Sequence, residues 1–373
     1  MAYQNVGNPK FYIDSLSYWK AKGDISDVTY GSINNAMNLI GLNPSSYIYE
    51  AQTFPHDIKI SFPQVAYQPK EATDKFFMGF FGHNFADLDL ETISLQSSNS
   101  SGTVYDVGSV NADSITVDEI CNWRDWSGAS GVFNGWSMGE WTGGHNDTFD
   151  EIKFTINRTA TSASTNILGC VAFGYIFQMP HSPDLKLTMT REYEGIKETA
   201  TVGGNTLTQI DYYAAPHWAG YPAWHLSDAN VKTYIDTNFK ENREPARGRR
   251  VWDLKFSYVS DTDIMPINEM LSIKNPTDSN TNDLARYNTN TQGTSGDFNS
   301  SGNFSSDHRR DTSWMSAVME KTIGGALPFI FQPDGNNNSP DQFAICQLDQ
   351  SSFKFKQVAH NVWDISLKIR EVW

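Results

Sequence analysis

The chain has 373 residues, 39% of them hydrophobic and 19% charged, so it is long enough to bury one large core or two smaller ones. Its net charge of −15, with no basic block, argues against a nucleic-acid-binding protein. No apolar run approaches the ~18 residues that a membrane span needs, and the N-terminus lacks the features of a signal peptide.

Residues 1–52 are expected to form a mixed N-terminal segment. Phe11–Asp14 is typical of a short strand, and Leu16 and Trp19 share a helical turn that Gly23 is expected to end.

Residues 53–178 contain short strand-like runs separated by turns rich in Gly, Ser and Asn. The apolar runs Phe76–Gly82 and Asn166–Gly174 predict buried strands, and Phe149–Ile156 alternates between apolar and polar residues. This pattern predicts a β-sandwich.

Residues 179–373 are expected to form a second β-rich domain with one or two short helices, which makes the whole chain mainly β. Residues 275–312 are rich in Asn, Ser, Thr, Gly and Asp, and we interpret them as a long surface loop. Trp314–Ile323 has helical spacing and ends at Gly324, and three short strands are expected to follow.

The last eleven residues carry the clearest strand pattern. Apolar side chains occupy one face, and polar side chains occupy alternate positions on the other; the apolar set is Trp363, Ile365, Leu367, Ile369 and Trp373. We expect this strand to lie at a sheet edge that serves for assembly, with Trp363 and Trp373 as candidate subunit contacts.

No catalytic constellation, cofactor motif or metal site is predicted. His83 follows a buried strand but has no evident nucleophile or orienting acid, so its ring and the amide of Asn84 are expected to bond loop backbone. The acidic turn residues do not form a calcium loop. Cys121, Cys170 and Cys346 show no zinc spacing, and the last two are expected to be buried free thiols in a protein made in a reducing cytoplasm.

Two clusters are candidate contact sites. Four tryptophans in or near a Gly-rich stretch are candidates for stacking on a glycan or for contacting a protein partner: Trp123, Trp126, Trp136 and Trp141. Four arginines form a basic island in an acidic chain and are candidates for a subunit interface, with a solvated loop as the alternative: Arg243, Arg247, Arg249 and Arg250.

The chain resembles phage tail structural proteins of the distal-tail or baseplate kind. Three segments carry this resemblance: Ile167–Asp184, Gly248–Phe256, and Trp314–Trp373 with its Gly324–Phe329 motif. Residues 53–178 separately resemble a discoidin-like jelly roll, in which Phe80–Asn84 matches a strand ending in Gly-His-Asn.

The resemblance implies a virion protein without enzymatic activity, made in the host cytoplasm. Its partners would be copies of itself in a ring and other tail or baseplate proteins. The alternatives are a receptor-binding or tail-fibre module that contacts host glycan, and a capsid-associated protein.

Overall fold

The computed structural model describes most of the chain. The described residues are 6–44, 46, 48–52, 55–62, 75–85, 92–98, 104–109, 118–121, 135–142, 150–157, 164–185, 187–193, 196–210, 248–265, 313–339, 342–350 and 352–372. The predicted loop 275–312 and five of the candidate contact residues lie outside them: Trp123, Trp126, Arg243, Arg247 and Trp373.

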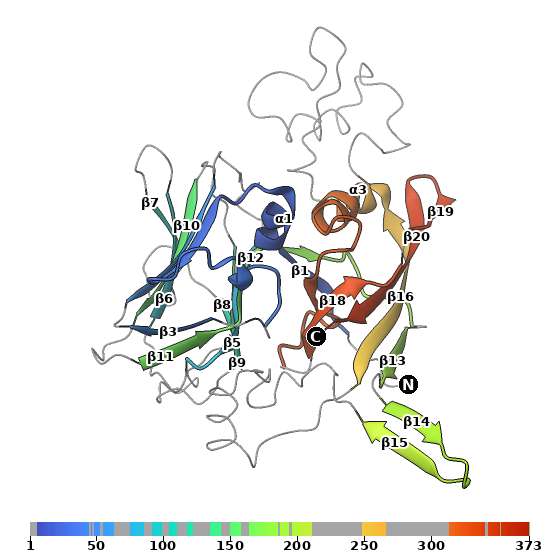
Figure 1. Ribbon diagram of the computed structural model, residues 1–373. Helices are drawn as coiled ribbons and strands as arrows, with labels where there is room; N and C mark the ends of the chain where they lie inside the picture. Colours follow the sequence, from blue (N-terminus) through green and yellow to red (C-terminus); the bar gives the residue numbers. More distant parts are fainter. Residues whose placement is uncertain are drawn as a thin grey trace, which may run out of the picture.

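The main element is an antiparallel sheet of eleven strands (Figure 1). Its order is β13 (Thr188–Glu192), β16 (Arg249–Ser260), β20 (Val362–Glu371), β18 (Ala344–Leu348), β17 (Phe329–Gln332), β1 (Lys10–Asp14), β12 (Cys170–Gln178), β5 (Lys75–His83), β9 (Gly135–Thr142) and β8 (Asp118–Cys121), with β19 (Phe355–Ala359) also paired to β20.

The second sheet packs against one part of the first and makes a β-sandwich, as predicted, although it includes a strand from before residue 53. Its order is β2 (Asp27–Tyr30), β4 (His56–Ser61), β10 (Glu151–Asn157), β6 (Thr92–Ser98) and β7 (Val104–Ser109). The two layers meet where Phe80 of β5 and Phe154 of β10 lie with ring centroids 5.6 Å apart. Two short sheets pair β3 (Ile48–Gln52) with β11 (Ser164–Leu168), and β14 (Ile196–Ala200) with β15 (Thr206–Ile210).

Strand β1 joins the N-terminal and C-terminal parts of the large sheet. Lys10 pairs with Gln178 of β12 on one side and with Gln332 of β17 on the other. At Gly174 the backbones approach so closely that a Cβ would lie 1.9 Å from the carbonyl oxygen of Ile13, so only glycine fits there. One sheet therefore continues across residue 178, and the division into three domains stays a prediction.

The helices are short. Helix α1 (Ser15–Lys22) follows β1 directly; the Asp14 side chain caps its first turn, and Gly23 ends it with φ at +76°. The 3-10 helix η1 (Met37–Leu39), helix α3 (Asp261–Ile264) and π-helix η5 (Met315–Glu320) are the others described here. None of the helices in the described residues has both the length and the apolar character of a membrane span.

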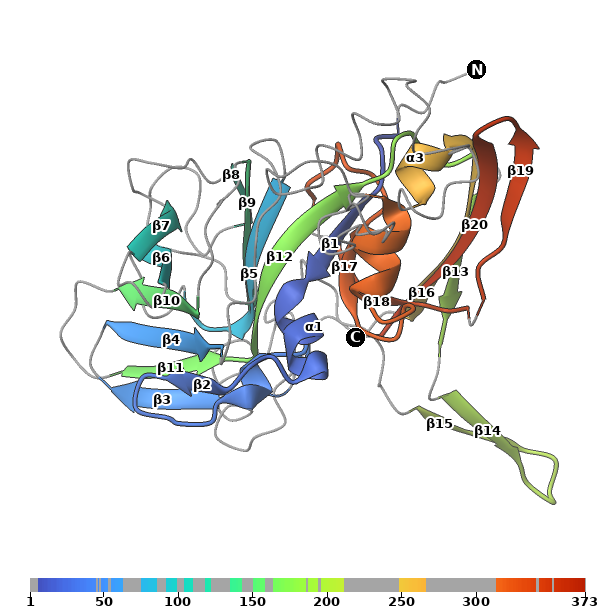
Figure 2. The same ribbon diagram turned by 90° about the horizontal axis from the view of Figure 1, so that it is seen from above.

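Strand β20 confirms the predicted alternation. Trp363, Ile365, Leu367 and Ile369 are buried in one core, with Trp314 of the helical segment. The prediction that this strand lies at an edge is wrong, because β16 pairs with one side of it and β18 and β19 pair with the other (Figure 2). Trp363 is a core residue and not a subunit contact in this structure.

Candidate functional site: an exposed apolar strand at the sheet edge

The predicted tryptophan platform is not formed by its two described members. Both indoles are buried on opposite faces of β9: Trp136 packs against Phe343, and Trp141 stacks on Phe76. Because protein covers both faces of this strand, neither ring has a free face for a sugar, which corrects that prediction for these two residues. Trp123 and Trp126 lie outside the described residues.

Arg250 is also internal, which corrects the prediction that it contacts another subunit. Its guanidinium binds the carboxylate of Glu371 through Nε at 3.0 Å and Nη2 at 2.8 Å, and donates to the carbonyl of Phe343 at 2.7 Å. The Glu371 side chain is 2% exposed and also accepts the Arg250 backbone N–H at 2.9 Å. This buried pair fixes β16 and β20 to the segment before β18. Arg249 is half-buried, and its interface role stays a prediction.

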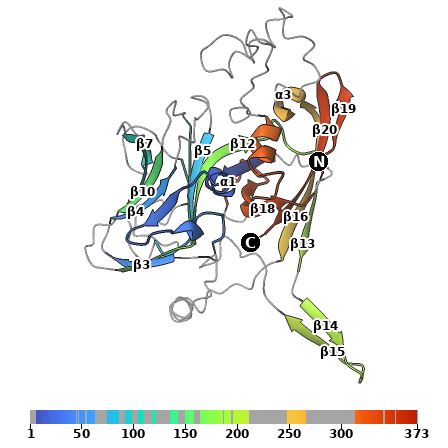
Figure 3. The same ribbon diagram turned by 45° about the horizontal axis from the view of Figure 1, so that its top comes forward.

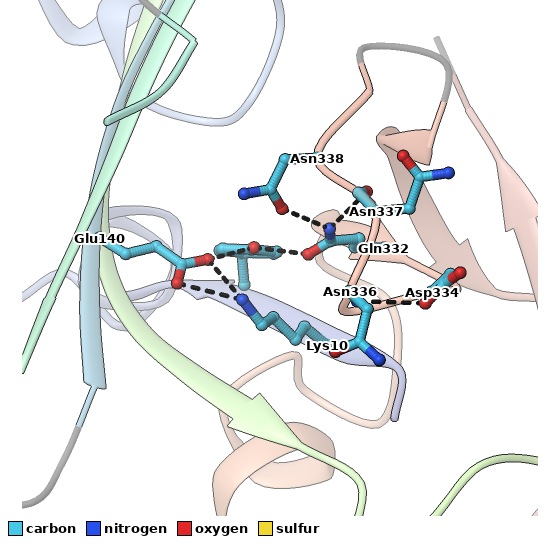
Figure 4. Close-up of polar contacts among 8 residues, drawn as sticks. Lys10, Glu140, Gln332, Asp334, Asn336, Asn337 and Asn338 are labelled. Atoms are coloured by element: carbon cyan, nitrogen blue, oxygen red, sulfur yellow. Dashed lines mark hydrogen bonds and ion pairs between the residues drawn. The ribbon is translucent and has the colours of Figure 1, made fainter. Parts of the chain in front are cut away.

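A second polar cluster lies where the large sheet curves back on itself. Lys10 of β1 binds Glu140 of β9 at 3.0 and 3.1 Å, although β12 and β5 separate these strands in the sheet (Figure 4). The Tyr12 hydroxyl bonds Glu140 and lies 2.8 Å from Gln332 Oε1.

Burial, with the nearby Glu140 charge, holds the pKa of Tyr12 well above its usual range, so its hydroxyl stays protonated. The Gln332 amide donates to Asn337 and Asn338, which completes the cluster. Because these side chains contact one another across β1, β9 and β17, we interpret the cluster as a set of contacts that holds the curvature of the sheet.

His83 and Asn84 behave as predicted. The His83 ring accepts the backbone N–H of Phe85 at Nδ1 and lies 2.8 Å from Ser137 Oγ at Nε2, while Asn84 accepts the backbone N–H of Ile167. Burial lowers the pKa of His83 to about 3, so the ring is neutral at ordinary pH. In the residues that the structure covers, no three His, Cys, Asp or Glu side chains lie together as a metal site.

Among the described residues, a group of exposed apolar side chains lies at β13, the last strand of the large sheet. Leu185, Leu187 and Met189 are 98%, 44% and 50% exposed. The register pairs Met189 with Trp252 of β16, whose side chain is buried in the core. Paired residues share a face, so Met189 continues the apolar core face beyond its covered part, and Leu185 and Leu187 lie exposed just before the strand.

The register of β13 does not extend to Asp184. The Asp184 backbone N–H donates to the carbonyl of Lys255 at 2.7 Å, two positions out of step with the pairing of Thr188 with Asp253, and the Asp184 carboxylate accepts a hydrogen bond from the Ser257 hydroxyl at 2.6 Å. In the part of the chain that is described, no strand pairs with the outer edge of β13. This edge combines an open hydrogen-bonding ladder with an apolar face, which are the two features that favour strand addition.

Directly after β13, strands β14 and β15 form a two-stranded ribbon that projects away from the sheet (Figures 1 and 3). Ala200 pairs with Thr206, and the turn is closed by Thr201, whose N–H donates to Asn205 at 2.7 Å. Val202 and Leu207 are exposed. A single two-stranded hairpin is marginally stable in water by itself, so this ribbon is suited to a further contact.

The alternating run Leu185–Met189 is typical of a strand, but its alternation does not show that its apolar side chains are exposed. An alternating strand has the same pattern whether or not a neighbour covers its apolar face. The ribbon was missed, although the Gly203-Gly204 pair between two Thr-rich runs is a hairpin signal.

Comparison with known proteins does not assign a family. No protein-family model matches the chain, and no curated protein matches it. Three of the similar solved structures are "CBM32-3 from a family 31 glycoside hydrolase from Clostridium perfringens", the C-terminal domain of a chitobiase from Bacteroides fragilis, and "CBM32 of AlyQ in complex with 4,5-unsaturated mannuronic acid".

These likenesses are weak and partial. Their TM-scores are 0.28, 0.27 and 0.25, with 10%, 11% and 13% identity. The alignments cover 44%, 41% and 40% of this chain, and 95% of each of the other chains. With TM-scores below 0.5, they support no conclusion about ligand or activity; the strand order itself establishes the mainly β class and the sandwich.

Proposed function

We propose that this protein is a structural protein without enzymatic activity that assembles with copies of itself. The observation that carries the proposal is the group of exposed apolar side chains at the β13 edge, of which Met189 continues the core face of the large sheet. The resemblance to phage distal-tail and baseplate proteins supplies the setting, in which the assembly would be part of a virion tail.

The energetics favour an interface at this edge. Fully burying one leucine or methionine side chain contributes roughly 1.5–3 kcal/mol, and association costs roughly 4–15 kcal/mol of lost freedom. Burial of the exposed apolar side chains offsets part of that cost. The backbone N–H and C=O groups on the outer side of β13 offset more of it when another strand pairs with them, and they fix the direction of the pairing.

Two matched double variants test this proposal. Leu187→Lys with Met189→Lys places two charges on the apolar face of the edge, whereas Thr188→Lys with Thr190→Lys places the same two charges on the opposite face. Molar mass is measured by light scattering over a wide range of protein concentration, and circular dichroism checks that each variant is folded.

We expect the parent and the threonine variant to form the same oligomer, and the Leu187/Met189 variant to shift toward monomer. A parent protein that stays monomeric at every concentration would refute self-assembly. A Leu187/Met189 variant that is as oligomeric as the parent would place the interface elsewhere.

The alternative function, contact with host glycan, predicts a different result. A monomeric protein with saturable binding on a glycan array would favour it, and the variants Trp123→Ala and Trp126→Ala would then separate tryptophan stacking from other contacts. The phage setting is tested separately, because it predicts that the chain is recovered with purified virions.

A further inference from the structure

Resting on the proposed self-assembly, we propose that the partner of the β13 edge is the β14–β15 hairpin of a second copy. In the described part of each chain, β13 is an edge strand with an open side and β14–β15 is a ribbon that pairs with no other strand, and all three strands have five residues. If the ribbon of one copy paired with the edge of another, the open side of β13 would gain a neighbouring strand and the ribbon would gain the support of a sheet.

The ribbon does not cover its own edge. Strand β14 begins at Ile196, four residues after β13 ends at Glu192, and the ribbon then runs away from the sheet (Figures 1 and 2). Strand β13 pairs with β16, and the ribbon's two strands pair with each other, in the described part of the fold. The edge of one molecule is therefore open to pair with the ribbon of another.

Charge favours a second copy of this chain as the partner. Two molecules with a net charge of −15 repel each other, and the repulsion is weaker where the surfaces that meet are neutral. Residues 185–210 contain three basic and three acidic residues, so this segment is neutral; they are Lys186, Arg191, Lys197, Glu192, Glu194 and Glu198. The edge and the ribbon therefore add no net like charge of their own to the contact.

The contact joins two different elements, the ribbon of one copy and the edge of another. If both copies of a pair give their ribbons to each other, a two-fold dimer closes. If they do not, each copy keeps a free edge or a free ribbon, and the contacts continue until a ring closes or a filament grows.

Cysteine cross-linking between two differently labelled copies tests the pairing directly. One copy carries Thr190→Cys in β13, and the other carries Thr199→Cys in β14 or Thr208→Cys in β15, so that either strand of the ribbon is sampled. The two are mixed, oxidised mildly and separated on a non-reducing gel. Lys356→Cys in β19, an exposed strand at another border of the sheet, replaces Thr190→Cys as the matched control.

We expect a covalent heterodimer with Thr190→Cys and a several-fold weaker product with Lys356→Cys or with the unmodified parent. Equal or stronger cross-linking from Lys356→Cys would overturn the edge assignment. An oligomeric parent with no cross-link from either ribbon position would overturn the pairing but leave self-assembly standing, whereas a monomeric parent would refute both.

A deletion gives an independent measurement. Replacing residues 196–210 with a short Gly-Ser linker removes the ribbon, and the ribbon contributes no residue to the core clusters of the described fold. We expect the molar mass to fall to that of a monomer while the melting temperature stays close to that of the parent. A deletion variant that remains oligomeric would overturn the proposal.

Discussion

Replacing Glu371 with alanine would remove the carboxylate that pairs with the buried Arg250 guanidinium. The carboxylate receives two guanidinium bonds, at 2.8 and 3.0 Å, and the backbone N–H of Arg250 at 2.9 Å. The two side chains are 2% and 11% exposed, so water cannot replace the lost partner without opening the sheet.

The expected cost is large relative to the stability of the fold. Removing one partner of a buried pair costs roughly 3–5 kcal/mol, and an unsatisfied buried N–H adds roughly 1–3 kcal/mol. Because total stability is roughly 5–15 kcal/mol, Glu371→Ala is expected to unfold the protein partly or fully. Glu371→Gln keeps an acceptor oxygen and is expected to lose less.

An exposed ion pair on the same sheet provides the control. Arg370 and Glu192 lie 3.0 Å apart, but their side chains are 31% and 39% exposed. Glu192→Ala is therefore expected to cost at most about 1 kcal/mol. Urea denaturation of the parent and the three variants measures these differences. Equal losses for Glu371→Ala and Glu192→Ala would show that the buried pair is not what holds these strands together.

Two further predictions concern buried ionisable groups. Burial raises the pKa of Asp14 to about 6 against the opposing bonds from Ser17 and the backbone, so the native state takes up a proton between about pH 4 and 6 more readily than the unfolded state. The stability of the parent relative to Asp14→Asn should therefore fall, by up to about 3 kcal/mol, as the pH rises from about 4 to about 7; a constant or rising difference across that range contradicts this. Burial likewise raises the pKa of the Cys170 and Cys346 thiols well above its usual range, so mass spectrometry should find them modified by a maleimide only after denaturant is added, and labelling of the native protein would show that they are accessible.

Local patterns predicted the elements that depend on neighbouring residues. The alternation of Trp363 to Ile369 predicted a two-faced strand, and the turn after Asp14 predicted a helix that Gly23 ends; the structure contains both. The prediction of an edge failed because a polar face and an open edge are different properties. The face points out of the sheet, whereas the edge lies in its plane, and alternation reports only the face.

Local sequence patterns could not predict the contacts between residues that are far apart in the chain. Arg250 and Glu371 are 121 positions apart, and Lys10 and Glu140 are 130 apart, so no local spacing connects them. Trp136 looked available because its segment is rich in glycine, but that segment is β9, which is covered on both faces. The exposure of Met189 could not be predicted from its own segment either, because the order of the whole sheet decides which strands lie beside β13.

The central position of β1 has a consequence for how the protein reaches its native state. Lys10 leaves the ribosome long before its two strand partners, because one of them contains Gln178 and the other contains Gln332. The large sheet therefore cannot be completed until most of the chain has been synthesised, and its pairings are mainly non-local, which is typical of slow folding. Until β17 arrives, one side of β1 is an unpaired strand that other nascent chains can join. Expression at low temperature or with chaperones is expected to raise the soluble yield for this reason.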